Sequence, residues 1–397
     1  IAIDLTQTAN ANKLQIFING KKYEGSFLNN TRNFTEGQAG TTLGHFNTAI
    51  DHTIGDNASI HSNGQLSAYL SEFYILDGQS IYSDASGTPN STFLNSDGDT
   101  LLTFCTQKNG VAVPKAYTGT FGNNGCRLTF EAGGKNTTAE STNNANNMTN
   151  VGDDKSGQGH NFGLASGTGY KVSVPDNPTN NFAVLNPLSK TSSLSLTGGN
   201  LIWSSSSYGY QGTTATMALP TTGKWYFECL IATAGAPTSH DFGIGIVSTQ
   251  DDGAMGSQSN NNTHVNGAFY VTRRDSGSRI MVDGSAVFLS DTVSVTSGQI
   301  MQCAFDADTG KIWFGRDNTW WNASGGAQTT ANAPSAGANQ SGTVDANHEY
   351  IIHFNGYTNT YVTVANFGSD SGFLNYISTS GSTTAQDANG IGDFYYN

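Results

Sequence analysis

The stretch Gly298–Trp320 constrains the fold more than any other part of this chain. Its first part, Ile300–Phe305, is a mostly apolar run with the length of a strand. The residues Asp306–Gly310 supply Asp and Gly, which tolerate the backbone angles of a tight reversal. The second part, Lys311–Gly315, alternates apolar side chains between two faces. The stretch therefore predicts a β-hairpin, and with it a sandwich built from short strands.

The composition supports an all-β chain. Charged residues make up 12% of the 397 residues, about half the usual share, and 48 residues are Gly. Residues of this kind favour turns and strands over helix interiors. Aromatic residues reach 11%, which is enough for a packed core. We therefore predict two β-sandwich (jelly-roll) domains joined by a polar Gly/Asn/Thr-rich connector.

The charge and the hydropathy exclude two classes of partner. The formal net charge is −13 and the chain has no Lys/Arg cluster, which argues against nucleic acid. No run of 18 apolar residues is present, so no membrane insertion is expected. The chain starts without Met inside an apolar run and stops at an aromatic one, so we expect both ends to be cut from a longer polypeptide.

Composition shifts divide the chain into four parts. Residues 1–133 contain regularly spaced strand signals, among them Leu14–Ile18 followed by the turn Asn19–Gly20. Residues 134–181 lose apolar periodicity and form the predicted connector. Residues 182–378 carry strand signals again, and 379–397 form a tail that leads to a missing segment.

Three stretches of the first part, IFINGKKYE (16–24), HTIG (52–55) and GQLSAYLSEFYILDGQSI (64–81), resemble the laminin-G/concanavalin-like jelly roll. The early strands of that family have no match, which implies an N-terminally truncated domain. The stretch 114–130 resembles a block that follows this domain in marine phage structural proteins.

The second half resembles another β-sandwich family. The stretches GKWYFECLI (223–231), DFGIGIVS (241–248), 298–320 and YVTVANFG (361–368) are similar, in this order, to the SPRY (B30.2-like) domain. The phrase NPTNNFAVLNPL (177–188) resembles the lead-in found in phage tail-fibre and virion proteins.

These resemblances imply a function. They imply a virion structural and adhesion protein, a phage tail fibre or surface appendage, located at the virion surface or extracellular. Loops at one sandwich end would bind a host cell-surface glycan or protein, beside contacts with other virion proteins. A homo-oligomer, with a trimer as the guess for a fibre, would supply avidity.

Two alternatives remain open. One is a secreted bacterial adhesin or extracellular filament subunit. The other is a polysaccharide-cleaving enzyme, which needs two carboxylates across a groove. Hydrolases on the concanavalin-like fold carry E-x-D-x-x-E on one strand, and this sequence lacks it. Glu72, Asp77 and Glu228 are isolated carboxylates, so we predict no catalytic residues and no enzyme.

No metal or other cofactor is predicted, although three stretches superficially resemble calcium sites. Gly152–Asn161 contains too few carboxylates, and the long loop Asp251–Asn262, with Asp251 and Asp252, is a similarly weak candidate. In the third, Asp306–Asp317, the later loop positions fall on a strand. Ordinary turns are favoured for the first and the third.

Ligand recognition has the stronger case. Sugars stack on Trp or Tyr rings and donate to or accept from polar side chains such as Asn, Asp and Arg. The candidates in or beside loops are Tyr208, Tyr210, Tyr270, Arg273, Arg274, Trp320 and Trp321. The competing interpretation places Trp313 and one of Trp320 and Trp321 in the core and the Arg pair in a solvated hairpin. Trp203 and Trp225 are assigned to the core.

The four cysteines, Cys105, Cys126, Cys229 and Cys303, lie in strand-like runs and are expected to be buried free thiols. The sequence leaves a Cys229–Cys303 bridge open.

Overall fold

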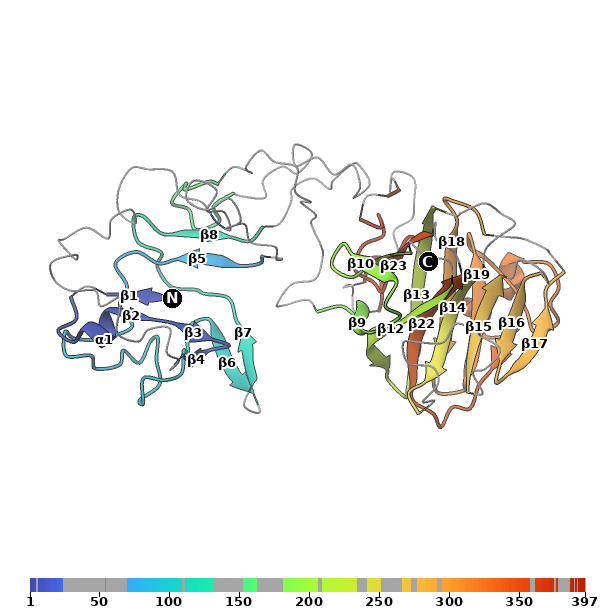
Figure 1. Cartoon of the computed structure of the whole chain (residues 1–397), viewed down its shortest axis with the longest axis horizontal. Helices are drawn as coiled ribbons and strands as arrows, with labels where there is room; N and C mark the ends of the chain where they lie inside the picture. The colour runs from blue at the N-terminus through green and yellow to red at the C-terminus, as the bar shows by residue number, and fades with distance from the viewer. Residues whose placement is uncertain are drawn as a thin grey trace. The chain divides into compact units, whose positions relative to one another are not determined.

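The computed structural model describes residues 1–4, 6–23, 54, 70–108, 111–130, 153–162, 181–205, 209–233, 241–250, 266–272, 277–290, 295–357, 361–374, 376–377, 386–388, 390 and 392–396. Within these ranges the α-helical structure is one turn, α1 (Asn10–Lys13), and the rest is strands, turns and two short 3₁₀ segments. The predicted all-β class is therefore confirmed. The chain forms two compact units (Figure 1). The first contains the described residues of Ile1–Glu131 and Asn150–Ala165, and the second those of Asn180–Asn397.

The first unit is built from paired short strands. They are β1 (Ala2–Ile3), β2 (Leu14–Gln15), β3 (Phe17–Ile18), β4 (Lys21–Lys22), β5 (Phe73–Ile75), β6 (Cys105–Lys108), β7 (Val111–Pro114) and β8 (Cys126–Leu128). They pair as β1–β2, β3–β4, β5–β8 and β6–β7, all antiparallel. A small core beside them contains Ile81, Tyr82, Phe93 and Leu94. The jelly roll expected here stays a prediction, because most of 24–69 lies outside the described residues.

The predicted turn Asn19–Gly20 is confirmed. Phe17 pairs with Lys22 and Ile18 with Lys21, so two residues connect β3 to β4. Both have positive φ, 50° at Asn19 and 75° at Gly20, as a type I′ hairpin requires. A Cβ on Gly20 would lie 2.6 Å from the Cys105 sulfur, so glycine is needed for space as well.

The second unit is a sandwich of two antiparallel sheets. One sheet has the order β10 (Leu194–Thr197), β11 (Ile202–Ser205), β23 (Val362–Asn366), β13 (Lys224–Thr233), β18 (Ile300–Asp306), β19 (Lys311–Arg316) and β20 (Thr319–Trp320), with β21 (Gly342–Thr343) paired to β19. The other has the order β17 (Ser285–Phe288), β16 (Arg279–Val282), β15 (Gly267–Thr272), β14 (Asp241–Ser248), β22 (Tyr350–Tyr357), β12 (Tyr210–Leu219) and β9 (Leu185–Lys190).

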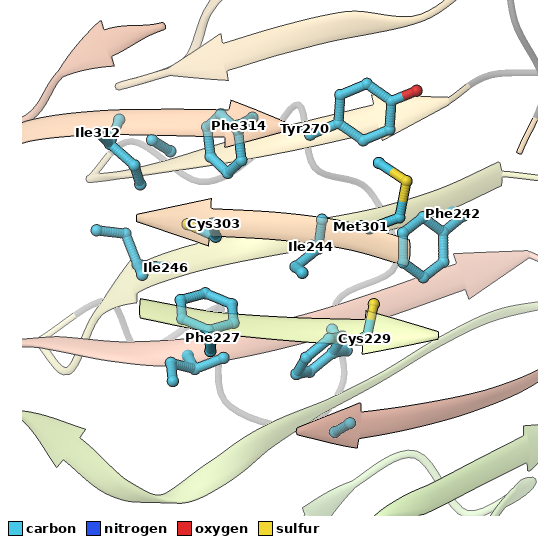
Figure 2. Close-up of a cluster of buried hydrophobic side chains, with 14 of the residues drawn as sticks. Phe227, Cys229, Phe242, Ile244, Ile246, Tyr270, Met301, Cys303, Ile312 and Phe314 are labelled. Atoms are coloured by element: carbon cyan, nitrogen blue, oxygen red, sulfur yellow. The ribbon is translucent and has the colours of Figure 1, made fainter. Parts of the chain in front are cut away.

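Apolar side chains from both sheets interdigitate between them (Figure 2). Strand alternation explains this arrangement, because residues two apart face the same side. Phe227 and Cys229 of β13 point inward beside Met301 and Cys303 of β18. From the opposite sheet come Phe242, Ile244, Ile246 and Tyr270.

The hairpin predicted from Gly298–Trp320 forms β18 and β19, which lie between β13 and the end strand β20 of their sheet. Cys303 pairs with Phe314 and Asp306 with Lys311. A second two-residue turn, Asp317–Asn318 with φ of 50° and 61°, connects β19 to β20. The reversal predicted at Asp306–Gly310 is therefore confirmed.

All four cysteines are buried free thiols, as expected. Cys229 and Cys303 both face the sandwich core and are not bridged. Burial raises the pKa of both thiols well above the ordinary value.

Among the described residues, no helix is long and apolar enough to span a membrane.

Candidate functional site

Three of the predicted ligand residues lie in the core, which corrects their assignment. Trp320 is 3% exposed, and Trp321 and Tyr270 are fully buried. Trp320 packs with Ala304 and Trp313 on the outer face of its sheet, beneath the segment that contains Ala333. Trp321 points to the other face and stacks on Tyr270, with ring centroids 4.5 Å apart. None of these rings presents a face on which a sugar could stack.

The other predicted ligand residues cannot be placed as side chains. Tyr208, Arg273 and Arg274 lie outside the described residues. Tyr210 is the first residue of β12, and only its backbone is described.

The two calcium-like stretches within the described ranges are organised as turns. In the first, Asp154 accepts hydrogen bonds from the backbone N–H of Arg127, Ser156 and His160, at 2.9, 2.8 and 3.0 Å. The Ser156 hydroxyl donates to the same carboxylate. In the second, Asp306 accepts from the Asp308 N–H at 3.1 Å. Asp251–Asn262 lies outside the described residues. Where side chains are described, no three His, Cys, Asp or Glu are grouped as metal ligands would be.

The first unit carries a group of partly exposed aromatic rings that the sequence did not single out. We call it the Tyr74 cluster: Tyr74, Phe104, Tyr117 and Phe121, with the ion pair Glu72–Arg127 at its margin. All four rings are half-buried. Tyr74 lies on β5 directly opposite Arg127 on β8, and Figure 1 shows these strands side by side. Phe104 precedes β6, and Tyr117 and Phe121 lie between β7 and β8.

The rings contact one another in a continuous group. The ring centroids of Tyr74 and Phe104 are 5.3 Å apart. The Tyr117 centroid lies 5.5 Å from that of Phe104 and 5.3 Å from that of Phe121. Tyr74 is also stacked with Phe121 at 6.3 Å and 11°. These separations are typical of favourable aromatic pairs, so the rings hold one another in place.

The segment that carries Tyr117 and Phe121 is fixed against the end of β5. The Asp77 N–H donates to the Phe121 carbonyl at 2.8 Å, and Asn124 donates to the Asp77 carboxylate. Gly122 has φ of 76°, and a Cβ there would lie 2.2 Å from the Asp77 carbonyl oxygen. Glycine at this position therefore lets the backbone approach β5 closely.

The margin of the cluster is polar but carries little net charge. Arg127 donates to both Glu72 oxygens at 3.0 Å, and the Tyr74 hydroxyl donates to the same carboxylate. The Arg127 guanidinium also lies 5.7 Å from the Tyr74 ring centre. Burial alone would raise the pKa of Glu72, but the hydrogen bonds from Arg127 and Tyr74 outweigh it and lower this pKa. Burial, together with the bond to Glu72, raises the pKa of Tyr74.

This arrangement has the parts of a sugar-binding surface: aromatic rings with accessible area beside a bidentate polar pair. The sequence contained one signal, because Tyr117 and Phe121 lie in a Gly/Asn-rich segment. It could not show that β8 pairs with β5, which is what brings Arg127 to Tyr74.

Comparisons with known proteins complete the description. No protein-family model and no curated protein matches the chain. Among solved structures, the SPRY domain of human HERC1 is similar, with 16% identity and a TM-score of 0.32 over 46% of this chain and 96% of that one. A human SPRY domain has 12% identity and a TM-score of 0.31, over 44% and 95%. The carbohydrate-binding module CBM66 from Bacillus subtilis has 10% identity and a TM-score of 0.27, over 45% and 91%.

Proposed function

We propose that this chain is a non-enzymatic adhesion protein of a virion surface, a tail fibre or similar appendage, that binds a host-surface glycan. The observation that carries the binding role is the Tyr74 cluster, where four half-buried rings adjoin the Glu72–Arg127 pair. The virion setting rests on the resemblance of residues 114–130 and 177–188 to phage structural proteins. The loops with Tyr208, Arg273 and Arg274 stay in the proposal as a second contact region.

The chemistry of the cluster favours an uncharged sugar. Glu72 and Arg127 neutralise each other, so neither offers a free charge to an anionic ligand. The pair still has hydrogen-bonding capacity, since its side chains are 29% and 28% exposed. A neutral pyranose would place its apolar face on a ring and its hydroxyls against this pair.

Assembly would strengthen a weak site. A single sugar on a partly exposed platform binds weakly, because little area is buried. We propose a homo-oligomer, with a trimer as the first hypothesis, in which several such sites act together. Light scattering coupled to gel filtration measures this state directly, and a monomer at micromolar concentration would contradict it.

The experiment that tests the binding role begins with a glycan array probed with the labelled chain. The affinity of the best neutral glycan is then measured by calorimetry for Tyr117→Ala and Phe121→Ala. We expect each variant to bind on the order of tenfold more weakly, the value of one aromatic contact. Tyr117→Phe keeps the ring and is expected to bind like the unmodified chain.

A matched control lies in the second unit. Phe288 is 59% exposed and packs against Arg279, so Phe288→Ala removes a ring that is more accessible than those of the cluster and far from them in sequence. It is expected to leave binding unchanged. Equal loss in Phe288→Ala and Tyr117→Ala, or no neutral glycan bound on the array, would overturn the assignment.

A further inference from the structure

Residues 154–160, which we call the Asp154 loop, contact both the strand and the loop that carry side chains of the Tyr74 cluster. On β8, the Arg127 N–H donates to the Asp154 carboxylate at 2.9 Å. The Arg127 carbonyl accepts from the Lys155 N–H at 2.7 Å. The Asp154 loop therefore bonds to both backbone groups of the residue whose guanidinium lies beside the Tyr74 ring.

The Asp154 loop also reaches the ring loop, which we define as residues 115–125 between β7 and β8. His160 Nε2 lies 2.9 Å from the Asn123 carbonyl oxygen. A carbonyl oxygen only accepts hydrogen bonds, so Nε2 carries the hydrogen and donates it. The His160 N–H donates to the Asp154 carboxylate at 3.0 Å. One carboxylate thus connects the contact on β8 with the contact on the ring loop.

The ring loop has a second attachment, at the end of β5. Asn124 donates from its N–H and its side-chain amide to the Asp77 carboxylate, at 3.2 and 3.1 Å. The Asp77 N–H donates to the Phe121 carbonyl at 2.8 Å. The adjacent residues Asn123 and Asn124 are therefore bonded to two different parts of the chain. Because the rings of Tyr117 and Phe121 are half-buried, these bonds help to fix their positions.

We propose, resting on the function proposed above, that the Asp154 loop positions the glycan site and that His160 and Asp154 are its positioning residues. Docked on β8, the Asp154 loop holds the ring loop in the geometry that binds a neutral sugar. Coupling between two sites is reciprocal in free energy. A sugar that binds this geometry therefore also stabilises the docked Asp154 loop, which belongs to the predicted connector.

The bonds themselves set the size of this coupling. The bond from His160 to Asn123 is exposed, so its removal should shift the docking equilibrium of the ring loop only about two- to fivefold. Asp154 accepts hydrogen bonds from the N–H groups of Arg127, Ser156 and His160 and from the Ser156 hydroxyl. Its removal should undock the whole Asp154 loop and have the larger effect, more than about tenfold.

Hydrogen exchange on the full chain, read at single residues, tests the positioning without a glycan. The Asp77 amide donates to the Phe121 carbonyl, so its protection reports the docked ring loop. We expect His160→Ala to lower this protection about two- to fivefold and Asp154→Ala to lower it more. His160→Gln keeps an N–H donor and is expected to retain the protection. If His160 fixed only its own loop, the Asp77 amide would exchange equally in His160→Ala and His160→Gln.

The coupling to binding is measured with the neutral glycan that gives the strongest signal on the array described above. By calorimetry, His160→Ala should bind this glycan about two- to fivefold more weakly, and His160→Gln should restore the affinity. In the reciprocal experiment, a saturating concentration of the same glycan should slow trypsin cleavage after Lys155 in the unmodified chain. The same addition should have a smaller effect on Tyr117→Ala, which binds the glycan more weakly.

A matched control lies directly before the Asp154 loop. Asp153 contacts Lys155 through a half-exposed ion pair at 3.8 Å, so Asp153→Ala removes a neighbouring carboxylate of little energetic weight. It should keep both the Asp77 protection and the glycan affinity. If Asp154→Ala does not fold, His160→Ala carries the test, since His160 is exposed and its removal leaves no buried cavity.

The negative results are distinguishable. Unchanged Asp77 protection in His160→Ala would overturn the positioning role. Lowered protection with an unchanged affinity would overturn the coupling to binding. If no neutral glycan binds on the array while the Asp77 protection falls, the function proposed for the Tyr74 cluster fails, and with it the glycan role of the Asp154 loop, although its hold on the ring loop stands.

Discussion

At the scale of single residues, Trp321 shows how an aromatic beside a turn becomes part of the core. Its ring is held between Tyr270, at 4.5 Å, and the Arg316 guanidinium, at 5.6 Å. The Trp321 N–H donates to the Phe314 carbonyl, and the Trp321 carbonyl accepts from the Ser341 hydroxyl. Neighbouring residues of an extended chain face opposite sides. Trp320 therefore packs on the outer face of its sheet, whereas Trp321 packs against Tyr270 on the inner face.

We predict that Trp321→Ala lowers the free energy of unfolding of the second unit by about 3–5 kcal/mol, because it leaves a large cavity in the core. Urea unfolding followed by circular dichroism measures this loss. Phe288→Ala serves as the control and should change stability by less than about 1 kcal/mol, since its ring is 59% exposed. Equal midpoints for the two variants would contradict the burial of Trp321.

At the scale of elements, residues 153–162 show how one carboxylate fastens a segment. The Asp154 backbone forms a bridge with Leu128, and its carboxylate accepts the Arg127 N–H. Burial alone would raise the pKa of Asp154, but the hydrogen bonds from Arg127, Ser156 and His160 outweigh it and lower this pKa to about 2. The described part of the predicted connector is therefore attached to the first unit.

We predict that Asp154→Ala releases this segment and makes the bond after Lys155 a site of rapid trypsin cleavage. Asp153→Ala is the matched control, because Asp153 contacts Lys155 only through a half-exposed ion pair at 3.8 Å. For a lowered pKa, the stabilisation is present above about pH 4 and is lost as the pH falls toward 2. Slow cleavage of the Asp154 variant at pH 8 would show that other contacts hold the segment.

A second prediction at this scale concerns the segment that carries Tyr117 and Phe121. Gly122→Ala places a Cβ against the Asp77 carbonyl, whereas Gly78→Ala has the same kind of backbone, φ of 70°, with nothing within 4 Å. Both pay the cost of a left-handed residue, about 1 kcal/mol. Only Gly122→Ala should also displace the cluster and weaken glycan binding. Equal thermal shifts and equal affinities in the two variants would contradict the close approach.

The elements also show what the sequence could predict. The strands β18 and β19 were predicted to within one residue, because an apolar run and an alternating run flank a turn marked by Asp and Gly. β12 was missed because its sequence, YQGTTATMAL, is polar, and its Thr213 and Thr214 are buried by tertiary packing rather than by their own hydropathy. Both β9 and β17 were missed too, and they lie at the edges of their sheet.

The site was less predictable than the fold, for a physical reason. Aromatic residues of this chain lie both in the core and at the surface, and the pairing of the strands decides where each one lies. The pairing of Tyr74 with Arg127 joins residues 53 positions apart, and the Tyr395 N–H that donates to Glu228 lies 167 positions later in the chain. Local patterns carry no information about contacts at such separations.

At the scale of the whole molecule, the charge balance makes a prediction about salt. The chain has 30 acidic and 17 basic residues, so it repels anionic surfaces. Because Glu72 and Arg127 neutralise each other, we expect the affinity for a neutral glycan to change less than about twofold between 50 and 500 mM NaCl. Calorimetry at both concentrations checks this, and a steep loss with salt would indicate a charged ligand instead.

Each compact unit contains two buried thiols, whose reactivity reports how often that unit opens. Cys105 and Cys126 belong to the first unit, and Cys229 and Cys303 to the second. A thiol-alkylating reagent can reach them only when the surrounding structure opens. The rate at which mass is added at each cysteine therefore measures the opening rate of the unit that contains it. One sample thus yields two opening rates, without any engineered label.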